Sequence, residues 1–348
     1  MPKPPQTPLL DFVSRQFRAF ADECRESSPL YERFATNIGD DPEVLALAAH
    51  ARRGEKVPNL LFAAVQFLLL KGTPHPLAAF YETHSTSAGD PYPPFRNFCL
   101  HHAERIIELI ANRTVQTNEV SRCALLLPAF VLVSREAAGR PLYLLEIGAA
   151  AGLILLWDRY GYDYGNGLRS GDAASAVQIR CDLRGRSTPD VPTTLPAVER
   201  RIGVDLNPID VDDTEQTLWL RSLVWPEDGE RARLLENAVT VARRNKPDMV
   251  AGDGIALLPE LLASVPKEAA LCIVRVFTNL PPAARDQFTA SITRHGKQRD
   301  LSVVSTRRGA REGESLLALV SYRNGVRSEA VLANCENHGK WLEWLNEN

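Results

Sequence analysis

Three short segments place acids beside glycines or at the end of apolar runs, an arrangement suited to holding a nucleotide or nucleoside. Residues 146–152 read EIGAAAG, and such small residues suit a loop where the backbone turns sharply and a ligand comes close. Asp205 ends the apolar run of RIGVD, where a carboxylate can accept hydrogen bonds from both hydroxyls of a ribose. Residues 252–254, GDG, follow a further apolar run and suit contact with an adenine edge.

Each segment also has an ordinary structural interpretation. Asp205, followed by Asn207 and Pro208, is typical of an Asx turn that opens a helix, and residues 252–254 are typical of a plain turn. The three segments nevertheless follow successive predicted strands in order. This order favours nucleotide or nucleoside binding over three unrelated turns.

Spacing helps to separate the nucleotide classes. A dinucleotide-binding unit places its ribose acid about 20 residues beyond the glycine loop, whereas Asp205 lies 53 positions beyond Gly152. No G-x-x-x-x-G-K-[ST] segment is present, which argues against a loop that cradles the phosphates of ATP or GTP.

From residue 140 onward, strand-like apolar runs alternate with helical segments. This alternation predicts an α/β domain with a mostly parallel sheet covered by helices on both faces. Asn324-Gly325 predicts an antiparallel hairpin at one edge of that sheet. The predicted strands are 142–147, 176–181, 201–205, 248–251, 270–277, 301–306, 315–323 and 329–334.

Residues 1–139 carry almost no strand signal. Apolar residues recur at helical spacing and are separated by breaks rich in Pro, Gly or Asp, which predicts packed helices. We therefore expect a helical N-terminal cap domain over 1–139 and a sheet domain over 140–348. Two of the expected helices cover 95–112 and 119–138.

Composition excludes several classes of protein. The net charge of -3 provides no basic field for sequence-independent nucleic-acid binding. The apolar run 60–70 is too short for a bilayer, which needs roughly 20 residues, and the N-terminus lacks a signal-peptide core. Six cysteines without pairing motifs fit a reducing compartment, so we expect a cytoplasmic protein. His101-His102 has no partner at metal spacing, and no metal site is predicted.

The segment QTNEVSR concentrates polar side chains before an apolar helix. One interpretation is a helix cap, with Thr117 or Asn118 at the cap and Glu119 in the first turn. The functional interpretation is a loop that covers a cofactor and orients a substrate, and both interpretations can hold together.

Arg275 lies inside a predicted buried strand and could anchor a carboxylate.

The acid-glycine loop, the ribose acid and the GDG turn together resemble the Rossmann-like class of S-adenosylmethionine-dependent methyltransferases. In that class the loop backs onto the methionine portion, the second acid holds the ribose and the third turn holds adenine. The resemblance implies a cofactor site formed by Gln116, Glu146, Gly148, Ala150, Gly152, Asp205, Leu206, Gly252, Asp253 and Gly254.

Four sequence blocks resemble, in order, the signature blocks of the bacterial DUF2332 family, which is assigned to the methyltransferase-like superfamily. Three positions depart from its pattern. Ala150 stands where Ser is common, and Ser121 stands where Gly is common. Residues 273–282, IVRVFTNLPP, lack the usual His-Ser or His-Thr pair, and Asn279-Leu280 interrupts a match to the N-P-P-Y of amino-group methyltransferases. The blocks are RTVQTNEVSR (113–122), LLEIGAAAGLILLWDRYGYDYG (144–165), GVDLNPIDVDD with WLRSLVWPE (203–227) and HGKWLEWL (338–345).

The resemblance implies a transferase that uses S-adenosylmethionine, first of all a methyltransferase acting on a small molecule. One alternative is an enzyme that releases methylthioadenosine, by aminocarboxypropyl transfer or by cyclisation to azetidine-2-carboxylate. A second alternative is a non-catalytic protein that binds an adenosyl ligand. We expect neither a nucleic acid nor a membrane as partner, and we leave open whether the protein forms a homodimer.

Tyr160, from DRYGYDYG, is either an ordinary strand or loop residue or an aromatic ring that lies near the sulfonium. The candidate catalytic residues are Asn118, Glu119, Tyr160 and Arg275.

Overall fold

The computed structural model describes residues 8–83, 89–116, 118–276 and 280–345. The chain divides into two compact units, the first formed by Met1–Thr117 with Asp213–Arg233, and the second by Asn118–Asp212 with Leu234–Asn348. The division falls at residue 117 rather than near 139. It groups helix α8 (Arg122–Glu136) with the sheet and a later segment with the N-terminal helices.

The first unit is built of helices, as the sequence predicted for the N-terminal third. Five helices, α1, α2, α3, α4 and α6, have proline in their first turn, where its fixed φ suits a helix start. Ser28 and Asp41 cap α2 and α3. Helix α4 is apolar on almost all sides and is buried in the core of this unit. The helices are α1 (Pro8–Cys24), α2 (Pro29–Ile38), α3 (Pro42–Ala48), α4 (Val57–Leu70), α5 (Ala78–Thr83), α6 (Tyr92–His101), α7 (Ala103–Asn112) and α9 (Thr214–Ser222), and α10 (Gly229–Arg244) continues from this unit into the second.

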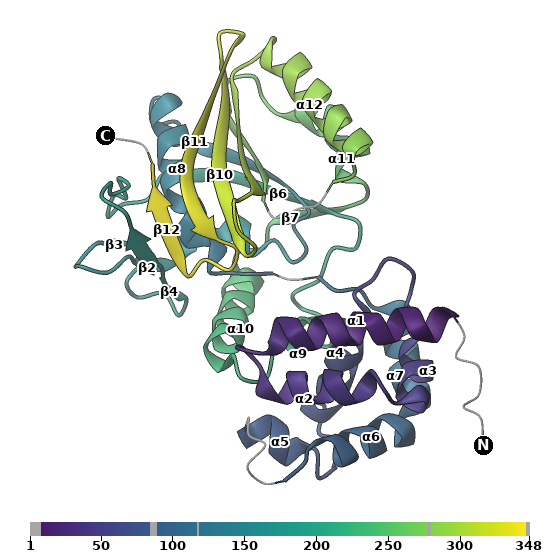
Figure 1. The fold of residues 1–348 in the computed structure, drawn as a ribbon. Helices are drawn as coiled ribbons and strands as arrows, with labels where there is room; N and C mark the ends of the chain where they lie inside the picture. The colour runs from purple at the N-terminus through teal and green to yellow at the C-terminus, as the bar shows by residue number, and fades with distance from the viewer. Residues whose placement is uncertain (1–7, 84–88, 117, 277–279, 346–348) are drawn as a thin grey trace. The chain divides into compact units, whose positions relative to one another are not determined.

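The second unit contains a nine-stranded, mostly parallel sheet in the order β5-β12-β11-β10-β9-β8-β1-β6-β7 (Figure 1). The five strands from β9 to β7 all run parallel to their neighbours. The strands are β1 (Leu142–Ile147), β5 (Asp182–Arg184), β6 (Val198–Asp205), β7 (Asp248–Ala251), β8 (Ala270–Arg275), β9 (Leu301–Arg308), β10 (Glu314–Arg323), β11 (Val326–Glu336) and β12 (Trp341–Trp344).

The predicted hairpin at Asn324-Gly325 is confirmed. Both residues have positive φ, 50° and 75°, as a two-residue hairpin turn requires, and β10 pairs antiparallel with β11. The hairpin is not the edge of the sheet, however. The C-terminal segment that contains Trp341 and Trp344 forms strand β12. This strand pairs with β11, and β5 pairs with β12 in turn.

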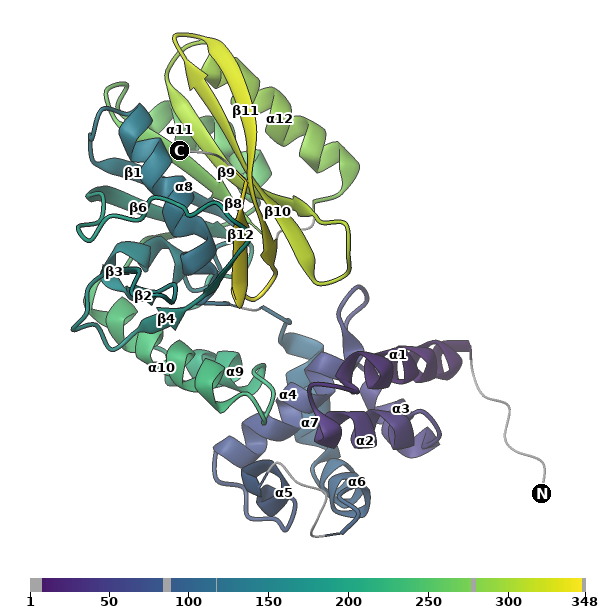
Figure 2. The same ribbon diagram turned by 60° about the vertical axis from the view of Figure 1, so that its left-hand side comes forward.

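Helices cover both faces of the sheet (Figure 2). Helices α11 (Gly254–Ser264) and α12 (Pro282–Gly296) pack on the face to which Tyr143, Leu145 and Ile147 of β1 point. Helix α8 lies on the opposite face, where Glu136 near its end accepts hydrogen bonds from Ser321 Oγ and Arg323 Nη2 of β10. Since side chains alternate along a strand, Glu146 of β1 lies on the α8 side.

The segment after the EIGAAAG loop differs from the expected α-helix. It forms a short 3₁₀ helix, η1 (Ile154–Arg159), followed by a small separate sheet of β2 (Gly161–Asp163), β3 (Arg169–Gly171) and β4 (Gln178–Arg180) in the order β3-β2-β4. The strand predicted at 176–181 therefore belongs to this small sheet and not to the large one.

The winding of the chain reverses at the centre of the large sheet. From β1 the chain moves outward to β6 and β7 on one side, and then returns to place β8 and β9 on the other side of β1. In open α/β sheets, ligands bind beyond the carboxyl ends of the strands at such a reversal. The reversal lies between β1 and β8, beside the loop that follows β1.

Adjacent arginines of β6 provide a matched test of the ion pair that holds η1. Arg201 Nη2 lies 2.6 Å from Asp158 Oδ2, with side-chain exposures of 14% and 11%, whereas the Arg200–Asp248 pair is 55% and 56% exposed. Arg201→Met removes the closer of two arginines that pair with the buried Asp158 carboxylate and leaves Arg159 Nε at 3.4 Å, so it should lower the free energy of unfolding by about 2 kcal/mol. Arg200→Met should cost less than about 1 kcal/mol. Urea unfolding monitored by circular dichroism measures both, and equal losses would contradict this account.

Candidate functional site

The loop after β1 has an unusual backbone. Gly148, Ala150 and Gly152 have φ values of 81°, 49° and 68°, a region that L-residues other than glycine rarely occupy. A Cβ atom at Gly152 would lie 3.0 Å from Met249 Sδ, so the backbone packs closely on β7 there. Ala150 carries a side chain in this conformation at a cost of order 1 kcal/mol, and such strain is found at sites that bind ligands.

Asp205 joins the loops that follow three neighbouring strands. Its Oδ2 accepts a hydrogen bond from Ala150 N at 2.8 Å, and its Oδ1 accepts one from Asn207 N at 2.9 Å. Its backbone oxygen accepts a hydrogen bond from Gly252 N at 2.8 Å. The second bond is the Asx turn that the sequence allowed. Asp205 therefore fixes the backbone of the loops at this edge.

The GDG turn after β7 begins helix α11. Asp253 is the N-cap, and its Oδ1 accepts hydrogen bonds from Ile255 N at 2.8 Å and from Ala256 N at 3.4 Å. Gly252 has a φ of 147°, and a Cβ atom at Gly254 would lie 2.9 Å from Ile147 Cγ2 at the end of β1. The turn thus has a structural role and also lies beside the β1 loop.

Leu206 follows Asp205 and is 70% exposed. Covering an apolar side chain of this size with another apolar surface lowers the free energy of the system. Its position makes Leu206 available to a flat apolar group at the carboxyl edge of the sheet.

Glu146 is a buried acid on β1, a strand with neighbours on both sides. It is 3% exposed, its backbone is paired with Gly203 of β6 and Val274 of β8, and its Oε2 has no hydrogen-bond partner among the described residues. Burial raises the pKa of Glu146 well above its usual value, the negative charge of Asp205 raises it further, and Arg122 acts in the opposite direction. The carboxyl group therefore favours its neutral form.

The QTNEVSR segment reaches the β1 loop through Asn118. Asn118 Oδ1 accepts a hydrogen bond from Ala151 N at 3.3 Å, and its buried Nδ2 has no hydrogen-bond partner among the described residues. Glu119 is 2% exposed. Helix α8 begins only at Arg122, with Ser121 at the N-cap, so the predicted helix start at 119 and the capping role of Asn118 are wrong. Thr117 lies outside the described residues.

Not all predicted site residues meet at this edge. Gln116 belongs to the first unit, where Thr114 Oγ1 donates a hydrogen bond to its Oε1 at 3.1 Å. Arg275, at the end of β8, lines a separate groove under α12. Asn279 lies outside the described residues, and the proline after Pro281 begins α12 as expected.

The structure corrects the catalytic prediction for Tyr160. Its side chain is fully buried, and its hydroxyl donates a hydrogen bond to Leu153 O at 2.8 Å. Tyr162 and Tyr164 are buried in the same way and donate to Trp157 O and Ala124 O. These alternating aromatic residues anchor the small sheet to η1 and α8, so Tyr160 is a structural residue.

Arg122 is the neighbour of Glu146 that the sequence argument did not select. Its Nε donates a hydrogen bond to Asn337 O at 2.8 Å, and its positive charge lowers the pKa of Glu146 against the effect of burial. The only signal in the sequence was its place at the end of QTNEVSR. Within the described ranges, no group of three or more His, Cys, Asp or Glu side chains is arranged to hold a metal ion.

The fold and this edge define a mixed α/β protein with a candidate ligand site at the carboxyl ends of three parallel strands. A family model described as "Uncharacterized protein conserved in bacteria (DUF2332)" matches residues 14–344. The chain belongs to the DUF2332 family, which confirms the resemblance carried by the four sequence blocks. Neither the curated proteins nor the solved structures contain a match to the chain. Over the described residues, each helix is too short or too polar to cross a membrane.

The pKa of Glu146 predicts a pH-dependent effect on stability. Because the folded-state pKa is raised, the wild-type protein loses stability as pH rises above the ordinary glutamate pKa of 4.5 toward the folded-state value. Glu146→Gln removes this loss, so its free energy of unfolding should increase relative to wild type between pH 5 and pH 8. Urea unfolding at both values measures the difference.

Glu260→Gln, on the exposed surface of α11, controls for the removal of one negative charge. A stability difference between Glu146→Gln and wild type that stays constant or falls as pH rises would contradict a buried neutral carboxyl group.

Proposed function

We propose that the second unit binds S-adenosylmethionine at the carboxyl edge of β1, β6 and β7 and transfers a group from it, first of all the methyl group, to a small molecule. One observation carries the proposal. The hydrogen bonds of Asp205 gather the small-residue loop, the candidate ribose acid and the GDG turn at the ends of three adjacent parallel strands.

The strand order supports a Rossmann-like class for this sheet. When β1, β6, β7, β8, β9 and β10 are numbered along the chain, they lie in the order 3-2-1-4-5-6, the order of doubly wound nucleotide-binding sheets. Strand β10 runs antiparallel to β9, and the other five are parallel. The β1 loop and Asp205 lie on the side of the reversal where such sheets hold nucleosides.

The polar atoms at this edge fit the two ends of S-adenosylmethionine. Glu146 Oε2 and Asn118 Nδ2 are buried without hydrogen-bond partners among the described residues, and the first suits an ammonium group while the second suits a carboxylate. Asp205 lies where the ribose acid is expected, and the exposed Leu206 suits the adenine face. Gly148, Ala150 and Gly152 would bring backbone close to the methionine portion. Contacts from Gln116 and Asp253 remain predictions.

The bound cofactor would supply a group on a sulfonium that is already a strong electrophile. The chain then needs chiefly to position the acceptor in line and to exclude water. In this proposal Asn118 positions the acceptor, whereas a role for Glu119, which is 2% exposed, stays a prediction. Tyr160 is not assigned to the site, because its fully buried hydroxyl group donates a hydrogen bond to Leu153 O.

The sharpest test uses an exposed side chain, since its loss leaves the fold intact. Asp205→Ala would remove the contacts to Ala150 and Asn207 as well as any ligand contact. Leu206→Ala, by contrast, should weaken S-adenosylmethionine binding about tenfold at unchanged stability, because covering a leucine side chain contributes about 1.5–3 kcal/mol. Val326→Ala at the hairpin, also 70% exposed, is the matched control and should leave affinity unchanged. Isothermal titration calorimetry measures all three proteins.

Mass spectrometry of the products then separates the reactions. Adenosylhomocysteine formed only with an acceptor supports methyl transfer, and methylthioadenosine formed without an acceptor supports cyclisation. Binding without turnover supports a non-catalytic adenosyl-binding protein. No measurable binding to the folded wild-type chain would overturn the proposal.

A further inference from the structure

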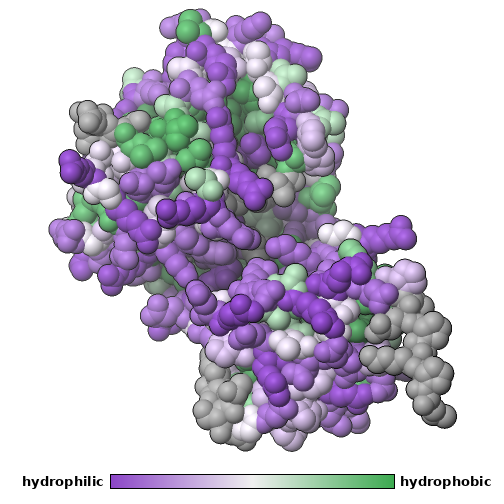
Figure 3. Space-filling model, in the orientation of Figure 1, coloured by the Kyte–Doolittle hydropathy of each residue, from purple (hydrophilic) through white to green (hydrophobic). Residues whose placement is uncertain are grey.

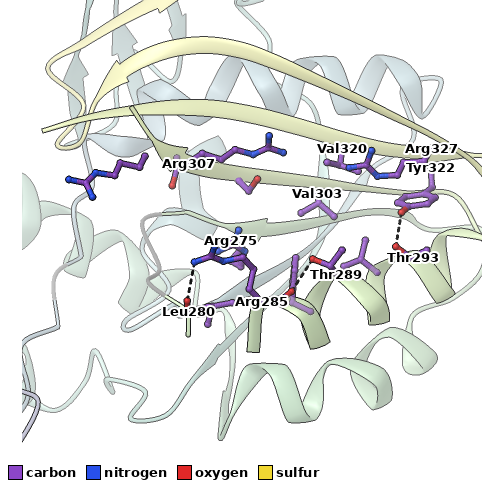
Figure 4. Close-up of a pocket in the computed structure, with 15 residues that line it drawn as sticks. Arg275, Leu280, Arg285, Thr289, Thr293, Val303, Arg307, Val320, Tyr322 and Arg327 are labelled. Carbon is purple, nitrogen blue, oxygen red and sulfur yellow. Dashed lines mark hydrogen bonds between the residues drawn. The ribbon is translucent and has the colours of Figure 1, made fainter. Parts of the chain in front are cut away.

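A groove within the second unit lies between helix α12 and strands β9 and β10 (Figure 4). Its volume is about 690 Å³, inside the range of about 300–1,000 Å³ that small-molecule sites occupy. It is built entirely from residues between β8 and β11, so it does not include the loop after β1.

Among the described residues that line this groove, five are arginine and none is aspartate or glutamate. The arginines come from β8, α12, β9 and β11, and so converge from separate parts of the sequence: Arg275, Arg285, Arg307, Arg308 and Arg327. Arg307 and Arg327 both pair with Glu329 of β11, and one carboxylate balances only one of the two charges. The groove therefore holds a large excess of positive charge in a chain whose net charge is -3.

Arg275 is the least exposed of the five arginines. Its guanidinium lies 5.2 Å from the Phe288 ring centre, and Figure 4 shows it beside Arg285. Burial lowers the pKa of Arg275, and the positive charges of Arg285 and Arg307 lower it further. Guanidinium groups of like charge raise the free energy of such a site unless an anion lies between them.

The floor of the groove is apolar. Phe288 and Ile292 of α12 face Val303 of β9 and Val320 of β10 across it. Hydroxyl groups at one end bond to each other, with Thr293 Oγ1 lying 3.1 Å from Tyr322 Oη. Figure 3 shows hydrophobic residues in the hollow beside α12 and hydrophilic residues along the hairpin. The groove thus combines a cationic rim with a surface suited to hydrocarbon.

We infer that this groove binds a small phosphorylated organic molecule that carries at least two negative charges and an apolar portion. Guanidinium groups match phosphate oxygens in geometry and charge. A single carboxylate, the anion first considered for Arg275, would leave most of the positive charge unbalanced. The limited volume and apolar floor favour a small molecule over a nucleic acid, whose backbone needs an extended basic surface. The inference does not depend on the proposed cofactor.

Calorimetric titration of the full chain with pyrophosphate, inorganic phosphate, 1-naphthyl phosphate and acetate at fixed ionic strength tests the inference. Pyrophosphate should bind more tightly than acetate, and 1-naphthyl phosphate more tightly than inorganic phosphate, because the naphthyl group can cover the floor. Arg285→Gln and Arg307→Gln should each weaken pyrophosphate binding by at least about tenfold. Both side chains are exposed, so the variants should fold.

Arg294→Gln is the matched control. Arg294 is also exposed and lies on α12, but it does not line the groove, so its loss should change affinity less than about twofold. An equal loss in this variant would assign the binding to general surface charge and overturn the inference. Equal affinity for acetate, no binding of either phosphate probe, or tighter binding of a single-stranded oligonucleotide would overturn it as well.

The same preparations distinguish this failure from failure of the proposed function. Arg307→Gln should leave S-adenosylmethionine affinity unchanged, and Leu206→Ala should leave pyrophosphate affinity unchanged. Loss of both ligands in either variant would contradict two separate sites.

Discussion

The hydrogen bond from Ala150 N to the carboxylate of Asp205 connects the carboxyl ends of the neighbouring parallel strands β1 and β6. It stabilises a left-handed conformation at a residue that is not glycine, and the same aspartate fixes the Asx turn at Asn207 and accepts a hydrogen bond from Gly252. Three loops that are distant in sequence depend on one residue. Any ligand held at this edge would meet a backbone that is already ordered, so little conformational entropy would be lost on binding.

Burial of Glu146 adds a second constraint to the same edge. Its raised pKa follows from burial in the sheet and from the nearby charge of Asp205. A neutral carboxyl group in that position is costly to ionise unless a cation approaches it. In the proposed function that cation is the ammonium group of the methionine portion. The α12 groove, by contrast, is lined by arginines, and its positive charge suits an anionic ligand. The two features therefore select ligands of different charge.

Regular elements were predictable from the sequence because their patterns are local. Strands β1 and β7 begin and end at the predicted residues, and Asn324-Gly325 gave the hairpin. The three-residue strands β2 and β3 escaped prediction because they are too short to show alternation, and β4 was assigned to the wrong sheet. An α-helix after the β1 loop was the natural expectation, but buried Tyr160 ends η1 after six residues. The arginine groove was represented only by Arg275, since its other arginines come from separate elements that only folding brings together.

Hydrogen–deuterium exchange of the full chain with and without saturating S-adenosylmethionine tests the central claim most directly, because it locates a ligand without a mutation. The account predicts slower exchange in peptides covering 146–153 and 205–210, where the amides of Ala150, Ala151 and Asn207 are ordered around Asp205 and Asn118. Peptides of the hairpin 314–336 should not change. Unchanged exchange at 146–153 and 205–210, or protection confined to other segments, would contradict it.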